Sequence, residues 1–255
     1  MSKQAAFSMA SETARSCSGA IETVADLTAA DRRQLWRLMD AHYVGLEPAE
    51  FDRDLAEKEW VITLRRANGE LVGFSTQTLL PVAGHPACLA LFSGDTVVAA
   101  AYRRSTALAG LWGVLALRLA DAHPGRRLYW FLISKGYKTY RYLPMFFRAY
   151  HPRAGQTAAA ETGAILDALG RARFGTRYDP VRRIVVAQED GCRLRPDVAP
   201  IDTARLHDPH VRFFVHANPG HARGDELCCL APLDRDNFTP AAWRVIHAAA
   251  ATVPS

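Results

Sequence analysis

The stretch that decides the fold is ACLALFSGDTVVAAAYRRSTALAGLWGVLALRLADA, residues Ala87–Ala122. Its pattern predicts an apolar strand, a short turn that carries Arg103 and Arg104, and a helix that is apolar on nearly every side. The first backbone N–H groups of such a helix have no partner within the helix, and the helix dipole adds positive charge beside them. Because two arginines lie at the same turn, the sequence predicts an anion site there, suited to a phosphate-bearing molecule.

The length and composition of the chain allow a full hydrophobic core. It has 255 residues, of which 49% are hydrophobic, and no apolar run reaches the roughly 18 uninterrupted residues of a membrane span. The first residues lack the apolar core of a signal peptide. We expect a disordered lead-in at residues 1–18 and a single domain at residues 19–255. That domain has a core at about 20–152 and a C-terminal part at 153–255 that completes the sheet.

The cysteines and the charge indicate the compartment and the partners. The five cysteines are odd in number and have no framework spacing, which favours a reducing cytoplasm. The net charge of +5 is a mild excess, and the arginines between Arg171 and Arg183 have no interleaved aromatic platform. We interpret that stretch as a solvated basic face, and we predict neither a nucleic-acid partner nor a membrane partner.

Strand and helix patterns alternate along the rest of the chain. Thr28 is a predicted helix cap, Asn68-Gly69 is a hairpin turn, and Pro144 is expected to kink or interrupt an aromatic helix. Besides the opening strand and helix, the predicted strands are 20–24, 60–64, 70–80, 127–134, 183–187 and a late pair, 211–216 with 226–232; the predicted helices are 29–42, 48–55, 137–150, 158–173 and one that begins at Pro240.

With its elements in this order, the chain resembles the GNAT acyltransferase superfamily. In that family a long central strand ends in a pyrophosphate-binding loop at the start of a helix, commonly Arg/Gln-x-x-Gly-x-Gly/Ala. The corresponding residues here are Val97 and Val98 on the strand and Arg103 in the loop. The resemblance covers roughly residues 20–152. It implies an α/β fold whose mixed, mostly antiparallel central sheet is flanked by helices, with a C-terminal helix and strand extension.

The loop departs from the family pattern, because Arg104, Thr106 and Leu108 stand where the family has glycines. Glycine lets the backbone approach a pyrophosphate closely, and side chains obstruct that approach. One alternative is that Arg103 and Arg104, with the hydroxyls of Ser105 and Thr106, bind the phosphates of an acyl-CoA. The other is that the acyl group arrives on the phosphopantetheine of an acyl carrier protein, which has one phosphate and no adenosine diphosphate.

The resemblance also implies a reaction, the transfer of an acyl group from a thioester to an amine. Such a site accepts a proton from the amine and returns one to the thiolate. In the family a tyrosine on the helix after the second central strand commonly protonates the thiolate, and here Tyr140 and Tyr142 are both candidates. Asp95 is the candidate general base, because it lies on the central strand and Gly94 leaves space beside it.

A second group of polar residues lies in the late turn HANPGHARGDE, which begins at His216. In the family this connection often lies beside the acceptor, so His216, Asn218 and His221 are candidate substrate-binding residues. Asp225 and Glu226 of the same turn are further candidates to contact the amine or to serve as base. A zinc site made from these histidines with Cys228 and Cys229 would have no standard ligand spacing, and neighbouring residues of a strand point apart. No metal is predicted.

The resulting hypothesis is a cytoplasmic N-acyltransferase with a small-molecule amine as its acceptor. Its co-substrate is acyl-CoA or a phosphopantetheine-linked acyl group. An alternative is a non-catalytic GNAT-like module that binds an acyl thioester or a protein partner. A hydrolase is not favoured, because the chain has no Gly-x-Ser-x-Gly elbow. Basic residues around the aromatic helix form either a docking surface for an acidic partner such as an acyl carrier protein or a solvated helix face: Lys135, Lys138, Arg141, Arg148 and Arg153.

Overall fold

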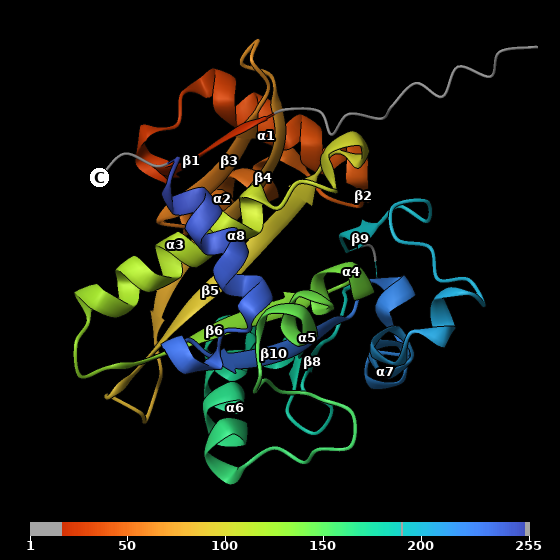
Figure 1. Cartoon of the computed structure of the whole chain (residues 1–255). Coiled ribbons are helices and arrows are strands. Elements are labelled where there is room, and N and C mark those ends of the chain that lie inside the picture. Colours follow the sequence, from red (N-terminus) through yellow and green to blue (C-terminus); the bar gives the residue numbers. More distant parts are fainter. Residues whose placement is uncertain (1–16, 190, 253–255) are drawn as a thin grey trace, which may run out of the picture.

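The computed structural model describes residues 17–189 and 191–252, so the lead-in expected at 1–18 lies almost wholly outside the described residues. An eight-stranded sheet crosses the molecule in the order β1-β3-β4-β5-β6-β10-β8-β7 (Figure 1). Neighbouring strands are antiparallel except β5 and β6, which run parallel. The sheet is therefore mixed and mostly antiparallel, as the sequence predicts. Its strands are β1 (Ser18–Thr23), β3 (Trp60–Arg65), β4 (Leu71–Pro81), β5 (Cys88–Val98), β6 (Arg127–Ser134), β7 (Tyr178–Asp179), β8 (Ile184–Val185) and β10 (Glu226–Pro232); β2 (Tyr43–Val44) pairs separately with β9 (Arg193–Leu194).

Helices cover both faces of the sheet. Leu91 of β5 packs with the residues of α3, and its neighbour Phe92 packs with those of α6, because successive strand residues point to opposite faces. In β10, the side chains of Cys229 and Cys228 likewise point to opposite faces of the sheet, as predicted: Cys229 packs on the α3 side and Cys228 on the α6 side. The first face carries α3 (Ala107–Ala122), α4 (Tyr137–Tyr140), α5 (Tyr142–Phe146), α7 (Pro209–Ala217) and α8 (Pro240–Ala250); the second carries α1 (Ala29–His42), α2 (Pro48–Ala56) and α6 (Ala160–Phe174); short 3-10 turns are η1 (Val24–Asp26), η2 (Ala100–Tyr102), η3 (Gly175–Arg177), η4 (Arg205–His207), η5 (His221–Arg223) and η6 (Arg235–Asn237).

Local sequence signals set several of these boundaries. The Thr28 hydroxyl accepts a hydrogen bond from the Asp31 N–H at 3.2 Å, and the Asp31 carboxylate accepts one from the Thr28 N–H at 3.1 Å. This capping box confirms the predicted start of α1. At the other end of the chain, the Thr239 hydroxyl accepts from the Ala242 N–H at 3.2 Å and begins α8. Both caps were identified from the sequence.

The prediction of a strand at 211–216 is wrong, because this segment belongs to helix α7. The Asp208 carboxylate accepts a hydrogen bond from the His210 N–H at 2.9 Å, and Pro209 occupies the first helical position. Those are the start signals of a helix. Val211 and Phe214, three residues apart, are the buried pair on its inner face. The other half of the predicted pair, residues 226–232, is strand β10.

The aromatic helix predicted at 137–150 consists of two short helices, α4 and α5, that meet at Arg141. Pro144 accounts for the interruption, because a proline ring obstructs the carbonyl of the residue four positions earlier, here Tyr140. The helical conformation ends at Phe146. Residues 147–150 continue in other conformations, and Phe147 forms an isolated bridge with Phe238.

Helices α3 and α8 pack very closely at Gly110. A Cβ atom added there would collide with the Val245 carbonyl oxygen and lie 2.7 Å from Ala249 Cβ. We therefore expect Gly110→Ala to lower the free energy of unfolding by about 1–3 kcal/mol through overpacking, although alanine is the better helix former. Urea unfolding followed by circular dichroism measures this change. An unchanged or higher unfolding midpoint would contradict the close packing.

The parallel strands β5 and β6 separate towards their C-terminal ends. Their pairing ends at Ser93 with Leu132, although β5 continues to Val98. On its other edge β5 is bulged, because Ser93 pairs with Gln77 and Thr96 with Ser75, three residues apart on one strand and two on the other. Bulges turn side chains out of the regular pattern and recur beside active sites. This bulge contains Gly94 and Asp95.

Candidate active site

A cavity of about 860 Å³ lies where β5 and β6 separate. Its walls come from β2, α2, the part of β5 beyond Ser93, the start of α3, α4 with α5, the end of α6, and the segment 187–205. Past the Ser93–Leu132 pair, the backbone groups of β5 that face β6 have no strand partner. The cavity therefore joins an open strand edge to side chains from both faces of the sheet.

Asp95 lies on the wall of this cavity, as the prediction of a base requires. Its carboxyl group has no hydrogen-bond or ion-pair partner within residues 17–189 and 191–252. Burial and the nearby Asp54 carboxylate raise the pKa of Asp95 to about 7, against the opposing effect of Lys135 and Lys58. A carboxyl with a pKa near neutrality is suited to accept and release protons.

Lys135 and Glu226 form the floor of the same region, although the sequence gave no reason to place them together. The Lys135 ammonium lies 3.2 Å from the Glu226 carboxylate and 5.6 Å from the centre of the Tyr43 ring. Burial acts to lower the pKa of Lys135, but Glu226, Cys192, Tyr43 and Asp95 together raise it above its ordinary value. The Lys135 side chain is therefore positively charged at neutral pH, forms an ion pair with Glu226, and interacts electrostatically with Asp95.

The two candidate acids lie in different environments. Tyr140 is fully buried at 0% exposure, and its hydroxyl donates to the Pro152 carbonyl at 2.9 Å, outside the cavity. Tyr142 lines the cavity, stacks on Phe146 at 5.7 Å, and its hydroxyl has no hydrogen-bond partner among the described residues. Burial raises the pKa of both tyrosines, so both hold their proton at neutral pH. Of the two tyrosines, only Tyr142 lines the cavity.

The predicted anion site forms one end of the cavity, which Arg103, Arg104, Ser105 and Thr106 all line. The Ser105 hydroxyl accepts from the Ala107 N–H at 3.3 Å, beside the start of α3. Val98 also lines this end, and its carbonyl accepts from Arg103 Nε at 3.3 Å.

A second cation, Lys138, approaches Arg103 at this end. Lys138 Nζ donates to the Val198 carbonyl oxygen at 2.6 Å, and Arg103 Nη1 lies 3.5 Å from the same atom. Burial and the positive charges of Arg103 and Arg205 lower the pKa of Lys138. Two cations therefore converge on one oxygen, an arrangement that a phosphate oxygen would also satisfy. Val97, although it lines the cavity, is 4% exposed and packs with the core under α1.

Of the candidates in the late turn, His216, Asn218, His221 and Asp225 do not line the cavity, and Glu226 does. Asn218 is fully buried and donates to the Asp225 carbonyl at 2.8 Å, and His221 packs edge-on against Phe214 at 5.6 Å. His216 lies in the last turn of α7. Because 211–216 is helical, this connection is directed away from the strand edge. The chain returns to the cavity only at Gly224 and Glu226.

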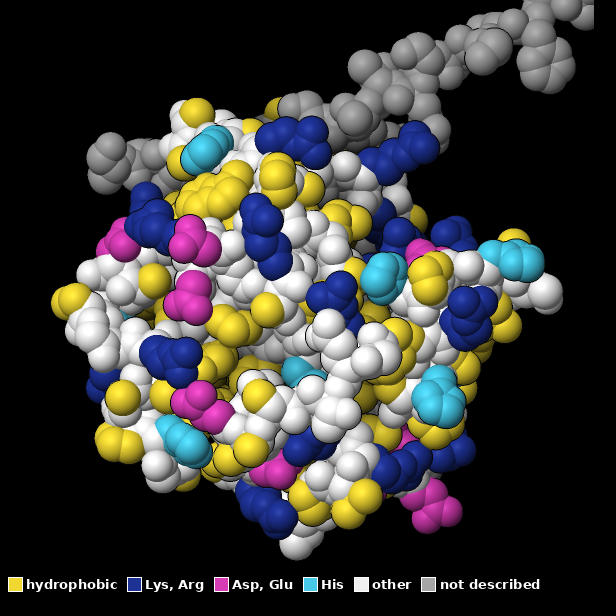
Figure 2. Space-filling view, turned by 60° about the horizontal axis from the view of Figure 1, so that its bottom comes forward, with side chains coloured by type: hydrophobic (Ala, Val, Ile, Leu, Met, Phe, Trp, Pro, Cys, Tyr) yellow, Lys and Arg dark blue, Asp and Glu magenta, His cyan; other side chains and the backbone are white. Residues whose placement is uncertain are grey.

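The basic residues considered as a docking surface for a carrier protein are engaged within the chain. Arg141 pairs with Asp208 at 3.3 Å, Arg148 Nε donates to the Phe238 carbonyl at 3.3 Å, and the Arg153 guanidinium lies 5.4 Å from the centre of the Tyr150 ring. On the face seen in Figure 2, Lys and Arg side chains are interleaved with acidic and apolar ones. Among the described residues, no group of three or more His, Cys, Asp or Glu is placed to hold a metal, and no helix is long and apolar enough to cross a membrane.

Comparison with known proteins gives only remote likenesses. No protein-family model and no curated protein matches the chain. Among solved structures, it resembles the GNAT-family N-acetyltransferase YhbS from Escherichia coli, solved with CoA, at 14% identity and a TM-score of 0.35 over 48% of this chain and 66% of that one. It resembles a conserved Enterococcus faecalis protein described as a probable N-acyltransferase, at 12% identity and a TM-score of 0.39, over 52% of this chain but 33% of that one. It also resembles the aminoglycoside acetyltransferase meta-AAC0020 from a soil metagenome, solved with sisomicin, at 17% identity and a TM-score of 0.36, over 49% and 82% of the two chains.

Proposed function

We propose that this chain is a GNAT-type N-acyltransferase that moves an acyl group from a thioester to the amine of a small molecule. The observation that carries the proposal is the meeting of an unpaired carboxyl, Asp95, and an unpaired phenol, Tyr142, in one cavity at the edge of separating parallel strands. The pKa of about 7 for Asp95 suits a base, and the raised pKa of Tyr142 suits an acid. The element order around Ala87–Ala122 supports the same class.

These groups allow a balanced reaction. The amine nitrogen attacks the thioester carbonyl carbon, and a C–N bond forms as the C–S bond breaks. The Asp95 carboxylate takes the proton that the amine loses, and Tyr142 gives its phenolic proton to the departing thiolate. Free backbone N–H groups on the open edge of β5 are positioned to stabilise the oxyanion. Amide and thiol are the products, and solvent restores both side chains.

Acyl-CoA is the default donor in this proposal. Arg103, Arg104 and Lys138 supply positive charge at the start of α3, where side chains replace the glycines of the family loop. For a phosphate to bind there, Arg103 and Lys138 must exchange their hydrogen bonds to the Val198 carbonyl for hydrogen bonds to the phosphate. A phosphopantetheine arm on an acyl carrier protein carries one phosphate to the same end, and remains the second donor within the proposal.

The direct test is to incubate the pure protein with a panel of acyl-CoA and acyl-carrier donors plus amines. Free thiol is followed by absorbance, and the amide product by mass spectrometry. Amide formation with the release of one thiol per amide supports the proposal. Tight donor binding without turnover across the panel would instead favour a non-catalytic module. The ratio of rates with the two donor kinds identifies the carrier.

Tyr142→Phe removes only the hydroxyl of the tyrosine that lines the cavity. We expect it to lower kcat by about 100-fold, because the thiolate then leaves without a proton donor. Tyr140→Phe is the matched control, since its hydroxyl bonds to Pro152 outside the cavity, and we expect kcat to stay within a few-fold of the wild type. Measurement uses thiol release at saturating donor. Equal kcat for Tyr142→Phe and the wild type would refute the acid role.

A further inference from the structure

A small side pocket lies beside the cavity on the face of the sheet that carries α3. Its volume is about 40 Å³, against about 860 Å³ for the cavity. Thr96, Leu108, Tyr142 and Phe146 line both spaces, so the two are adjacent. Tyr142, the proton donor to the thiolate in the proposed reaction, is one of the residues that they share. A thioester whose sulfur lies near this hydroxyl has the side pocket within reach of its acyl tail.

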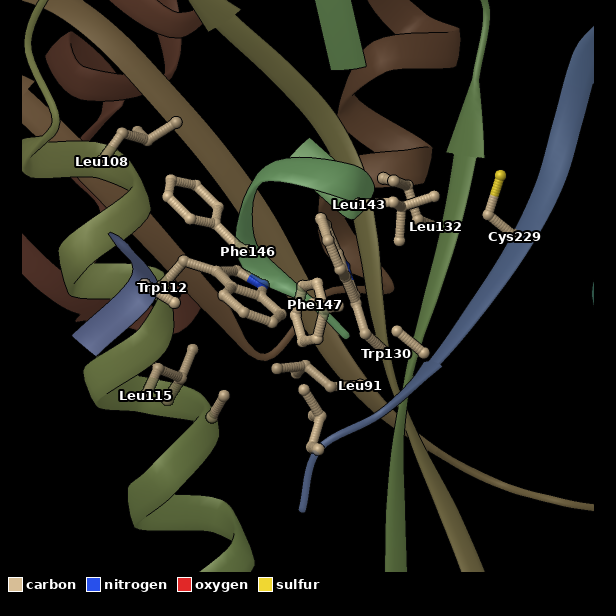
Figure 3. Close-up of a cluster of buried hydrophobic side chains, with 14 of the residues drawn as sticks. Leu91, Leu108, Trp112, Leu115, Trp130, Leu132, Leu143, Phe146, Phe147 and Cys229 are labelled. Atoms are coloured by element: carbon tan, nitrogen blue, oxygen red, sulfur yellow. The ribbon is translucent and has the colours of Figure 1, made fainter. Parts of the chain in front are cut away.

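Aromatic rings close the far end of this pocket. Trp112 of α3 and Trp130 of β6 lie 4.5 Å apart between ring centres, and Phe147 contacts both, at 6.2 and 5.5 Å. Figure 3 shows these rings gathered with Phe146 between α3, α5 and β6. Trp112 is 9% exposed and Trp130 is 6% exposed. The end wall is therefore a packed part of the core.

Hydrogen bonds fix one of these rings in place. Trp130 Nε1 donates to the Ser93 hydroxyl at 2.8 Å, and that hydroxyl donates to the Gln77 amide oxygen at 2.6 Å. The Gln77 amide nitrogen donates to Ser75 at 2.7 Å, and Ser75 and Thr96 share a bond of 2.7 Å. This chain of bonds crosses β4, β5 and β6. Rotation of Trp130 to admit a longer ligand would break it in a buried setting, which is costly.

From this geometry we infer that Trp112 and Trp130 form a stop that restricts the donor to short acyl groups of about two to four carbons. The inference rests on the proposed function and names its donor class. A pocket of this volume holds about three non-hydrogen atoms beyond the carbonyl. The aromatic side chains of this region fill the space that a longer acyl chain would need.

The test uses CoA thioesters from acetyl to octanoyl with any accepted amine. We expect kcat/KM to fall by about ten-fold or more with each methylene added beyond the four-carbon acyl group. Binding is measured in parallel by calorimetry with non-transferable thioether analogues of the same lengths. The affinity for these analogues follows the same order if the stop exists. Equal binding and equal rates for acetyl and octanoyl donors would overturn the inference.

Two variants change the pocket in opposite directions. Trp112→Phe shortens the stop, and we expect the preference to move towards longer acyl groups. Trp36→Phe is the matched control, since Trp36 of α1 packs on Phe51 of α2, away from the pocket. Ala109→Leu fills the pocket from its wall without removing a core contact, so it keeps the fold if Trp112→Phe does not. Because Ala109 lines the cavity as well as the pocket, the affinity for CoA itself is measured alongside, and we expect butyryl transfer to be lost before acetyl transfer. A length profile unchanged in Ala109→Leu would reject the side pocket as the acyl site.

The outcomes separate this inference from the proposed function. If the protein turns over and kcat/KM does not depend on acyl length, the acyltransferase proposal stands and the inference of an aromatic stop is rejected. Absence of turnover with every donor and amine would remove the proposed reaction, and the thioether series still measures whether acyl length limits binding.

Discussion

Asp95→Asn is expected to lower kcat/KM by about 10²–10⁴-fold, the range for loss of a general base. The amide keeps the shape of the carboxyl group but accepts no proton at neutral pH. Because the pKa of Asp95 is about 7, the wild-type kcat/KM should rise as the pH rises through about 7 and level off above it, where the base is ionised. The variant should lose this rise.

Thiol release across pH 5.5–9 measures the effect, with donor affinity followed separately by calorimetry. Asp121→Asn is the matched control, since Asp121 is an exposed carboxylate bound to Arg235 at 2.7 Å on the surface. We expect the control to behave as the wild type, and Asp95→Asn to bind the donor normally. A variant that keeps half of the wild-type kcat/KM would exclude Asp95 as the base.

Lys58→Met is expected to affect both stability and the pH profile. Lys58 lies under the bulge, with a side chain that is 0% exposed and an ammonium 2.6 Å from the Asp54 carboxylate. Removing the cation leaves Asp54 with Arg173 as its remaining partner at 3.0 Å. We expect the free energy of unfolding to fall by about 2 kcal/mol. Lys58 also holds down the pKa of Asp95, so the rise in kcat/KM should move to higher pH.

Arg66→Met is the matched control for this change. Arg66 pairs with Glu70 at 2.7 Å with the same spacing of four residues, but both side chains are about half exposed. Such surface pairs contribute about 0–1 kcal/mol, so the control should change neither unfolding nor the pH profile. Urea unfolding and the midpoint of kcat/KM against pH are the two measurements. If Lys58→Met matched Arg66→Met in both, the buried pair would have no effect on Asp95.

The elements that the sequence predicts well are those with a clear start signal or a strict period. Strand β6 has the predicted bounds, 127–134, because its apolar run is bounded by charged residues and Lys135-Gly136. Helix α7 was missed because VRFFVH has the short apolar pattern of a strand. The signal was nevertheless present in Asp208-Pro209, which has the same form of cap and proline as Thr239-Pro240.

The site was predictable in part. Asp95 and Tyr142 both line the cavity, and each was proposed from a local feature: a glycine on a central strand for Asp95, and the helix after the next strand for Tyr142. The meeting of Lys135, Glu226 and Tyr43 was not predicted, because β6, β10 and β2 bring them together from distant parts of the chain. No local pattern encodes that meeting. His216, Asn218 and His221 stay outside the cavity because α7 changes the direction of the chain before β10 begins.

The position of β10 has a consequence for how the protein is made. Strand β10 comes from residues 226–232, yet it lies in the interior of the sheet between β6 and β8. During synthesis, β6 therefore has an unpaired edge for nearly 100 further residues, a period in which exposed strand edges invite wrong pairings. Asp95 and Tyr142 emerge from the ribosome early, but Glu226 reaches Lys135 only when this late strand is inserted. The lining of the cavity is thus completed by a late long-range pairing of the fold, and its assembly depends on the correct insertion of β10.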